Sequence, residues 1–136
     1  MARLDLVAIR KALADQIRPA VPNTTAYRPD SVATGAPTVW VDMPPVQKLT
    51  FQPGAVWNIP LTVVLAVGDT WDRTSQQTVD ELIVDIWEVV DGDKTLGGTV
   101  SAAVATEFTP VTSAENRGWV GGLLDVKVSL NATLAS

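Results

Sequence analysis

The stretch DTWDRTSQQTVDELIVDIWEVVDGDKTLGG, residues 69–98, carries the clearest periodic signal in the sequence. Asp72 or Thr74 can cap the start of a helix, because a side-chain oxygen there accepts hydrogen bonds from free backbone N–H groups. Gly92 can end the helix in the left-handed conformation. The stretch therefore predicts a helix over residues 73–91. Its buried stripe consists of apolar residues three and four positions apart: Val79, Leu82, Ile83, Ile86, Trp87 and Val90.

Other helical and extended patterns surround this helix. Residues 4–18 repeat the helical spacing, and Pro19 stops it because proline cannot donate to the helical ladder. Pro60 also lacks an N–H, which places its part of a strand at a sheet edge or a bulge. Alternation of apolar and polar residues predicts strands over 38–43, 46–52, 55–67, 99–108 and 119–130.

This order of elements predicts the fold class. We expect an α+β fold, with a mostly antiparallel β-sheet and two main helices, about 4–18 and 73–91, packed on one face. The chain of 136 residues is the size of one domain, so residues 1–136 are expected to form a single unit. Hydrophobic content of 46% with 18% charged residues is typical of folded proteins. No apolar run is long enough to cross a membrane, so no contact with a membrane is expected.

The charge pattern is strongly acidic. The net charge is −5, and eight of the fifteen acidic residues lie between Asp69 and Asp93. Tight binding to nucleic acid needs clustered Lys and Arg, so this chain is not expected to hold DNA specifically. The simpler interpretation is a solvated helix face. The alternative is an acidic surface that meets a basic partner or DNA that must slide past without binding, formed by Asp80, Glu81, Asp85 and Glu88.

The residues that usually carry catalysis and metal binding are scarce. The sequence contains no His and no Cys, which removes the commonest general base, metal ligand and thiol nucleophile. Asp91-Gly92-Asp93 opens like a calcium loop, but Leu96 stands where that loop needs glycine and no glutamate closes it. Catalysis by surface carboxylates of the helix is weak, because a catalytic pair needs burial to separate its pKa values. We therefore expect no catalytic residue, no cofactor, no metal site and no enzymatic activity.

Large aromatic residues outside the main core are candidates for protein interfaces, or else pack under loops. Trp57 and Trp87 fall on predicted core faces, whereas Trp40 lies on the strand face opposite Val39 and Val41. Gly121-Gly122, inside a strand, suggests a bulge or the close approach of another backbone. From exposed aromatics and the loops at 42–54, 92–98 and 110–118, the candidate interface residues are Trp40, Pro44, Pro45, Trp71, Lys94, Arg117 and Trp119.

The order of parts around the central helix resembles the tail terminator proteins of long-tailed phages, siphovirus-type, especially those from phages of actinobacteria. Such proteins have a long apolar strand, a short acidic turn containing Asp-Arg, an amphipathic helix, an acidic stretch with Leu-Gly-Gly, and paired C-terminal strands. The matching segments here are LTVVLAVGDTWDRTSQQTVDELIVDIWEVV, DGDKTLGGTVSAAVATEF and GWVGGLLDVKVSL. The likeness covers most of the chain, and the Pro44-Pro45 break departs from the family pattern.

The resemblance implies a structural virion protein rather than an enzyme. Tail terminators form a hexameric ring on the finished tail tube, stop its polymerisation and present the surface to which the head docks. The implied partners are other copies of this chain, the tail tube protein and a head completion or stopper protein, with DNA passing through the ring. The implied location is the head–tail junction of the virion, after assembly in the host cytoplasm. Alternatives are another head–tail joining protein, such as a stopper or connector, a monomeric chaperone-like binding module, or a small carboxylate enzyme.

Overall fold

The computed structural model describes residues 5–30, 36–42, 47–49, 55–98, 100–115 and 117–132. Pro44 and Pro45, two of the candidate interface residues, lie outside these residues. In chain order the described elements are α1 (Leu6–Ile17), β1 (Thr24–Thr25), β2 (Thr38–Asp42), β3 (Gln47–Leu49), β4 (Ala55–Gly68), α2 (Arg73–Gly92), β5 (Ala102–Val111) and β6 (Val120–Ala132).

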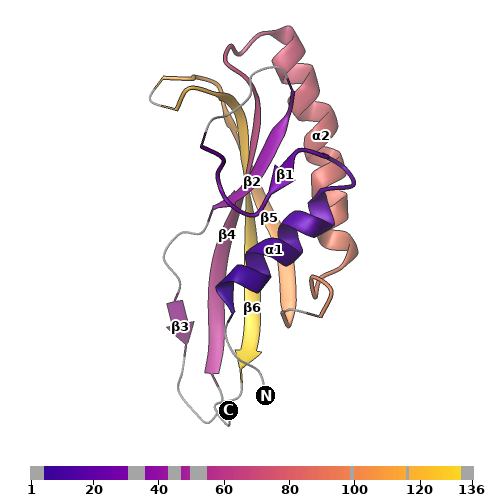
Figure 1. The fold of residues 1–136 in the computed structure, drawn as a ribbon, viewed down its shortest axis with the longest axis vertical. Coiled ribbons are helices and arrows are strands. Elements are labelled where there is room, and N and C mark those ends of the chain that lie inside the picture. The colour runs from indigo at the N-terminus through magenta and orange to yellow at the C-terminus, as the bar shows by residue number, and fades with distance from the viewer. Residues whose placement is uncertain are drawn as a thin grey trace.

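The strands form one sheet with the order β1-β2-β4-β6-β5, and β3 pairs with the other end of β4. The β1–β2 pair is parallel, whereas the pairs that join β2, β3, β4, β6 and β5 are antiparallel. Both helices lie on one face of this sheet (Figure 1). The α+β prediction is thus confirmed, with the short parallel β1–β2 pair as its exception.

The central helix α2 begins as its sequence predicts. The Asp72 carboxylate accepts a hydrogen bond from the Ser75 backbone N–H at 2.8 Å, and the Ser75 hydroxyl donates to the Thr70 carbonyl at 2.8 Å. The helix ends at Gly92, but not through a left-handed glycine at that position as predicted. The left-handed backbone comes later, in the turn of residues 93–98, with φ of 49° at Leu96, 71° at Gly97 and 88° at Gly98.

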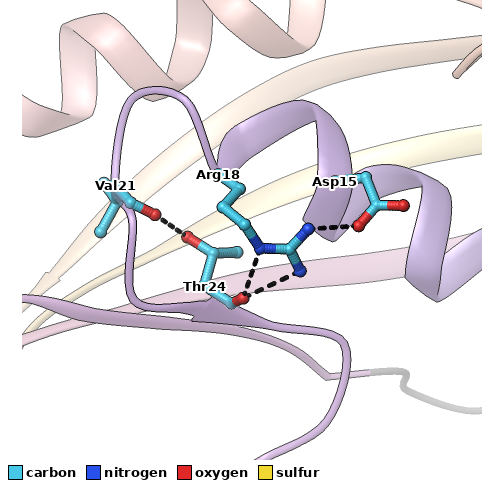
Figure 2. Close-up of polar contacts among 4 residues, drawn as sticks. All are labelled: Asp15, Arg18, Val21 and Thr24. Carbon is cyan, nitrogen blue, oxygen red and sulfur yellow. Dashed lines mark hydrogen bonds and ion pairs between the residues drawn. The ribbon is translucent and has the colours of Figure 1, made fainter.

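The helix α1 is tied to the rest of the fold through its polar side chains. Gln16 donates from its amide to the carbonyl oxygens of Val89 at 2.6 Å and Val90 at 3.2 Å, which satisfies backbone groups near the end of α2. Figure 2 shows the Arg18 guanidinium between the Asp15 carboxylate and the Thr24 carbonyl oxygen. Arg18 thereby joins the end of α1 to β1.

The strand β4 carries much of the core. Its odd-numbered residues face the helices, and Ile59, Leu61, Val63 and Leu65 are all buried there. Pro60 pairs with Lys127 of β6 on one side. On the other side it lies between Thr62, which pairs with the end of β2, and Asn58, which pairs with the start of β3. Among the described residues, Pro60 therefore lies at a local edge between the positions where β2 and β3 pair, which suits a residue without an N–H.

The glycine pair in β6 marks a close approach inside the subunit. A Cβ atom on Gly121 would lie 1.8 Å from the carbonyl oxygen of Leu65. This distance is far below van der Waals contact, so the β4 backbone leaves no room for a side chain. The close-approach prediction is confirmed, and its cause is internal packing rather than a subunit contact.

The β5 strand extends to Val111, so the predicted polar loop at 110–118 begins two residues later than expected.

Candidate functional site

The acidic residues of α2 lie together on its outer side. Asp80, Glu81, Asp85 and Glu88 are all exposed. With 100° between successive residues, Glu81, Asp85 and Glu88 project from the side of the helix opposite the buried Val79, Ile86 and Val90. Asp80 lies on the flank of the helix, one turn before Val84. The four carboxylates are exposed as expected, and the role of this face stays a prediction. All four carboxylates are open to solvent, without the burial that a pair of catalytic carboxyl groups needs.

An apolar groove runs beside this acidic face, between α2 and the edge strand β5. It has a volume of about 420 Å³ and is lined by Ile83, Val84, Trp87, Glu88 and Phe108. Glu88 is the one charged residue in this lining. We call these five residues the α2–β5 groove.

The groove contains apolar surface that the subunit itself leaves uncovered. Val84 is an apolar residue on the same outer side of the helix as the acidic residues, and it is 53% exposed. Ile83, Trp87 and Phe108 are only partly buried where they pack against the main core. Exposed apolar side chains gathered in one groove and rimmed by charge are typical of a protein interaction site.

A second feature lies on the sheet face away from the helices. Trp40 and Trp119 meet edge to face, with ring centroids 5.6 Å apart and an interplanar angle of 84°. The Arg28 guanidinium lies 5.6 Å from the Trp40 ring centroid, and that of Arg117 lies 5.7 Å from the Trp119 ring centroid. Arg28, Trp40, Arg117 and Trp119 form what we call the Arg–Trp cluster. It is an array of guanidinium, indole, indole and guanidinium groups.

This cluster corrects the prediction that Trp40 and Trp119 are exposed interface aromatics. Trp40 is 1% exposed and Trp119 is 4% exposed. They are buried because this end of the reverse sheet face has a small apolar core of its own, which also contains Val64, Ala66 and Val111. The exposed groups are instead the two arginines that lie over the indole rings.

The remaining interface candidates lie in three different connecting segments. Trp71 lies in the turn that precedes α2, where it is partly buried and packs against the main core. Lys94 is exposed in the turn after α2, and Arg117 is exposed in the loop between β5 and β6. Of these three residues, only Arg117 belongs to a larger cluster.

The turn at Asp93 uses its carboxylate internally. Asp93 accepts hydrogen bonds from the Thr95 hydroxyl at 2.8 Å, the Thr95 N–H at 3.0 Å and the Gly97 N–H at 2.9 Å. These bonds, that of the Thr95 side chain above all, hold the pKa of Asp93 below its ordinary value. Among the described residues, no group of three or more acidic side chains is gathered closely enough to hold a metal ion.

Sequence reasoning missed Arg28 and the groove. Arg28 precedes Pro29 in a turn, and nothing in its local pattern places it over a tryptophan 12 positions later in the chain. Val84 did carry a signal, because helical spacing places this apolar residue between Asp80 and Glu88 on the outer face. Phe108 is partly buried against the main core and also lines the groove.

No protein-family model matches this chain, and no curated protein matches it significantly. None of the helices among the described residues has the length and apolarity needed to cross a membrane.

Proposed function

We propose that this protein is a phage tail terminator, which forms a ring on the end of the tail tube, stops its polymerisation and offers a docking surface to the head. The observation that carries the proposal is the arrangement around α2. The long strand β4 leads through the turn with Asp72 and Arg73 into α2, and the Leu96-Gly97-Gly98 turn leads on to the paired strands β5 and β6. This is the order of parts that the family resemblance implies.

The surface of the subunit supports a ring-forming role. A ring built by repeating one head-to-tail contact needs two different patches on each subunit. The α2–β5 groove lies on the helix side, and the Arg–Trp cluster lies on the reverse face of the sheet. These two surfaces differ in chemistry, since one is apolar and acidic and the other presents arginines.

In this proposal the part of the acidic face that lies outside the α2–β5 groove, Glu81 and Asp85, lines the passage for DNA. Carboxylates on a lumen wall repel phosphates, so the DNA moves through without being held. Glu81 and Asp85 are the best members with which to test this role, because both are exposed and neither lines the α2–β5 groove. Replacing them by Gln and Asn removes two charges per subunit without touching the groove. We expect an intact ring and altered DNA passage, and a ring that fails to assemble would contradict the lumen role.

The decisive experiment is capping of tail tubes. Purified tube protein is polymerised with and without this protein, and tube length and tube ends are measured by electron microscopy. A terminator shortens the length distribution and leaves a ring-shaped density on one end of the tube. A stopper or connector leaves tube length unchanged and binds only to tubes that already carry a terminator. A chaperone-like module binds the unassembled tube protein instead, and either of these results would overturn the proposal.

The proposal places the protein at the head–tail junction of the virion, in contact with the tube protein and with a head completion or stopper protein. Immunogold labelling of intact particles tests this location directly. Label at the junction is the expected result, and particles without label would contradict it.

A further inference from the structure

We propose that the Arg–Trp cluster of one subunit docks into the α2–β5 groove of the next, and that this contact is the one the assembly repeats. The inference rests on the proposed ring and names the surfaces that build it. Its occupant for the groove is therefore a second copy of this chain.

The groove is suited to a side chain with an apolar body and a cationic head. Val84, Trp87 and Phe108 offer apolar surface, and Glu88 places a carboxylate at the rim. An arginine can lay its methylene groups and guanidinium plane on an indole ring while donating hydrogen bonds to a neighbouring carboxylate. Lysine, whose ammonium is a strongly hydrated point charge, fits such a site less well.

The Arg–Trp cluster presents two arginines whose guanidinium groups are already held in place by an indole ring. Arg28 lies over the Trp40 ring and Arg117 over the Trp119 ring, and the two indole rings pack edge to face against one another. Stacking restricts the motion of side chains that would otherwise lose much conformational freedom on binding. Arginine and tryptophan are also the residues in which the binding energy of protein interfaces concentrates.

The placement of the two surfaces favours a head-to-tail contact. The groove is on the helix side of the sheet, the cluster is on the opposite side, and Figure 1 shows the turn between β5 and β6 on the side of the molecule away from α2. A subunit therefore cannot fill its own groove with its own Arg117.

Charge favours the same contact over a symmetric one. If two grooves met face to face, Glu88 of one copy, together with Asp80 one helical turn before Val84, would approach the same carboxylates of the other copy, and like charges across an interface disfavour that pairing. Two Arg–Trp clusters meeting would oppose four guanidinium groups. The unlike pair, groove with cluster, is the combination in which the charges attract.

The test exploits the fact that each subunit carries both surfaces. In the cluster variant, Arg28→Glu and Arg117→Glu reverse the charge of the cluster; in the groove variant, Asp80→Lys and Glu88→Lys reverse the charge of the groove rim. Both acidic residues are exposed, so their replacement leaves the core intact. The native mass of each protein is measured by analytical ultracentrifugation across a concentration series, with circular dichroism to verify folding.

Each variant alone should self-associate about 100-fold more weakly than the wild-type protein, because it opposes like charges. An equimolar mixture should recover assembly, because the acidic cluster of one variant fits the basic groove of the other, and the two unchanged surfaces also match. The recovered particles should contain the two variants in alternation, which native mass spectrometry can verify. Lys11→Glu, which reverses an exposed charge on α1, is the matched control and should leave assembly unchanged.

Three results would overturn the contact: wild-type assembly by either folded variant, a mixture that does not recover, or a wild-type protein that stays monomeric at every concentration. None of these results decides the proposed function, because a ring on the tube end can use other surfaces or be held together by the tube instead of by this contact. Failure of tube capping would conversely overturn the terminator role and leave a recovered mixture as evidence for the contact.

Discussion

The Phe108 ring lies directly over the backbone of Gly122. A Cβ atom on Gly122 would lie 2.2 Å from both Cε1 and Cζ of that ring. Phe108 and Leu124 are cross-strand partners, so the ring leans along the sheet to cover the place where β6 has no side chain. Phe108 also lines the α2–β5 groove, and the missing side chain of Gly122 therefore helps to set the shape of that groove.

Gly122→Ala should alter the groove more than it alters stability. The new methyl group meets only the end of a side chain, which can swing aside, so we expect a loss of about 1 to 2 kcal/mol in the free energy of unfolding. The displaced ring changes the groove lining, and self-association should weaken. Urea denaturation gives the first quantity and sedimentation the second. A variant that is less stable but associates normally would show that Phe108 does not shape the contact.

Gly121→Ala should be more damaging than its neighbour. Its methyl group would meet the Leu65 carbonyl oxygen at 1.8 Å, and this atom belongs to the backbone of the central strand β4, which cannot swing aside. We expect a loss of about 3 kcal/mol or more, at the upper end of overpacking effects. Parallel urea titrations of the two alanine variants test the ranking. Equal losses in both would show that the β4 backbone yields as easily as the Phe108 ring.

The elements that the sequence predicts well are those defined by local periodicity. The stripe from Val79 to Val90 and the alternation along 55–67 each contain the information for one element, and α2 and β4 follow them closely. The caps of α2 are equally local, which is why Asp72 could be named in advance. The end of α2 at Gly92 differs in conformation because the left-handed residues are placed four to six positions later, in the turn where Asp93 accepts hydrogen bonds from the Thr95 and Gly97 N–H groups.

The features that the sequence predicts poorly depend on which distant segments meet. Alternation correctly puts Trp40 on the face opposite Val39, but only the tertiary structure shows that Trp119 covers it there. Arg28 joins the same cluster from a turn without periodicity. The local edge at Pro60 likewise depends on where β2 ends and β3 begins along β4. The sequence thus named the acidic residues and Arg117 of the candidate interaction surface, but neither Arg28 nor the apolar groove.

Trp119→Ala should destabilise the protein and change the environment of a second tryptophan. Trp119 is almost fully buried, and removing a buried tryptophan side chain costs about 3 to 5 kcal/mol. Its loss uncovers Trp40, whose fluorescence should shift to longer wavelength as water reaches the ring, while Trp119→Phe should preserve most of the packing. Stability measurements and emission spectra of both variants check this. An unchanged Trp40 emission in Trp119→Ala would contradict the edge-to-face packing.

The Asp93 turn should contribute to stability in a pH-dependent way. The pKa of Asp93 is held below its ordinary value of 3.8, chiefly by the Thr95 hydroxyl and then by backbone N–H groups. Because the folded pKa is the lower one, the stabilisation is complete above the unfolded pKa and is lost as the pH falls through the folded pKa. The difference in unfolding free energy between wild type and Asp93→Asn should therefore be constant from about pH 5 to 7 and shrink below about pH 4.

The Thr95→Val variant isolates the cause of this pKa shift. It removes the hydroxyl donor and leaves the backbone N–H groups of Thr95 and Gly97 in place. The pKa of Asp93, measured by NMR titration of its carboxyl carbon, should rise toward the ordinary value without reaching it, because the backbone donors still favour the charged form. A pKa of Asp93 that does not move in Thr95→Val would show that the backbone N–H groups alone stabilise the carboxylate.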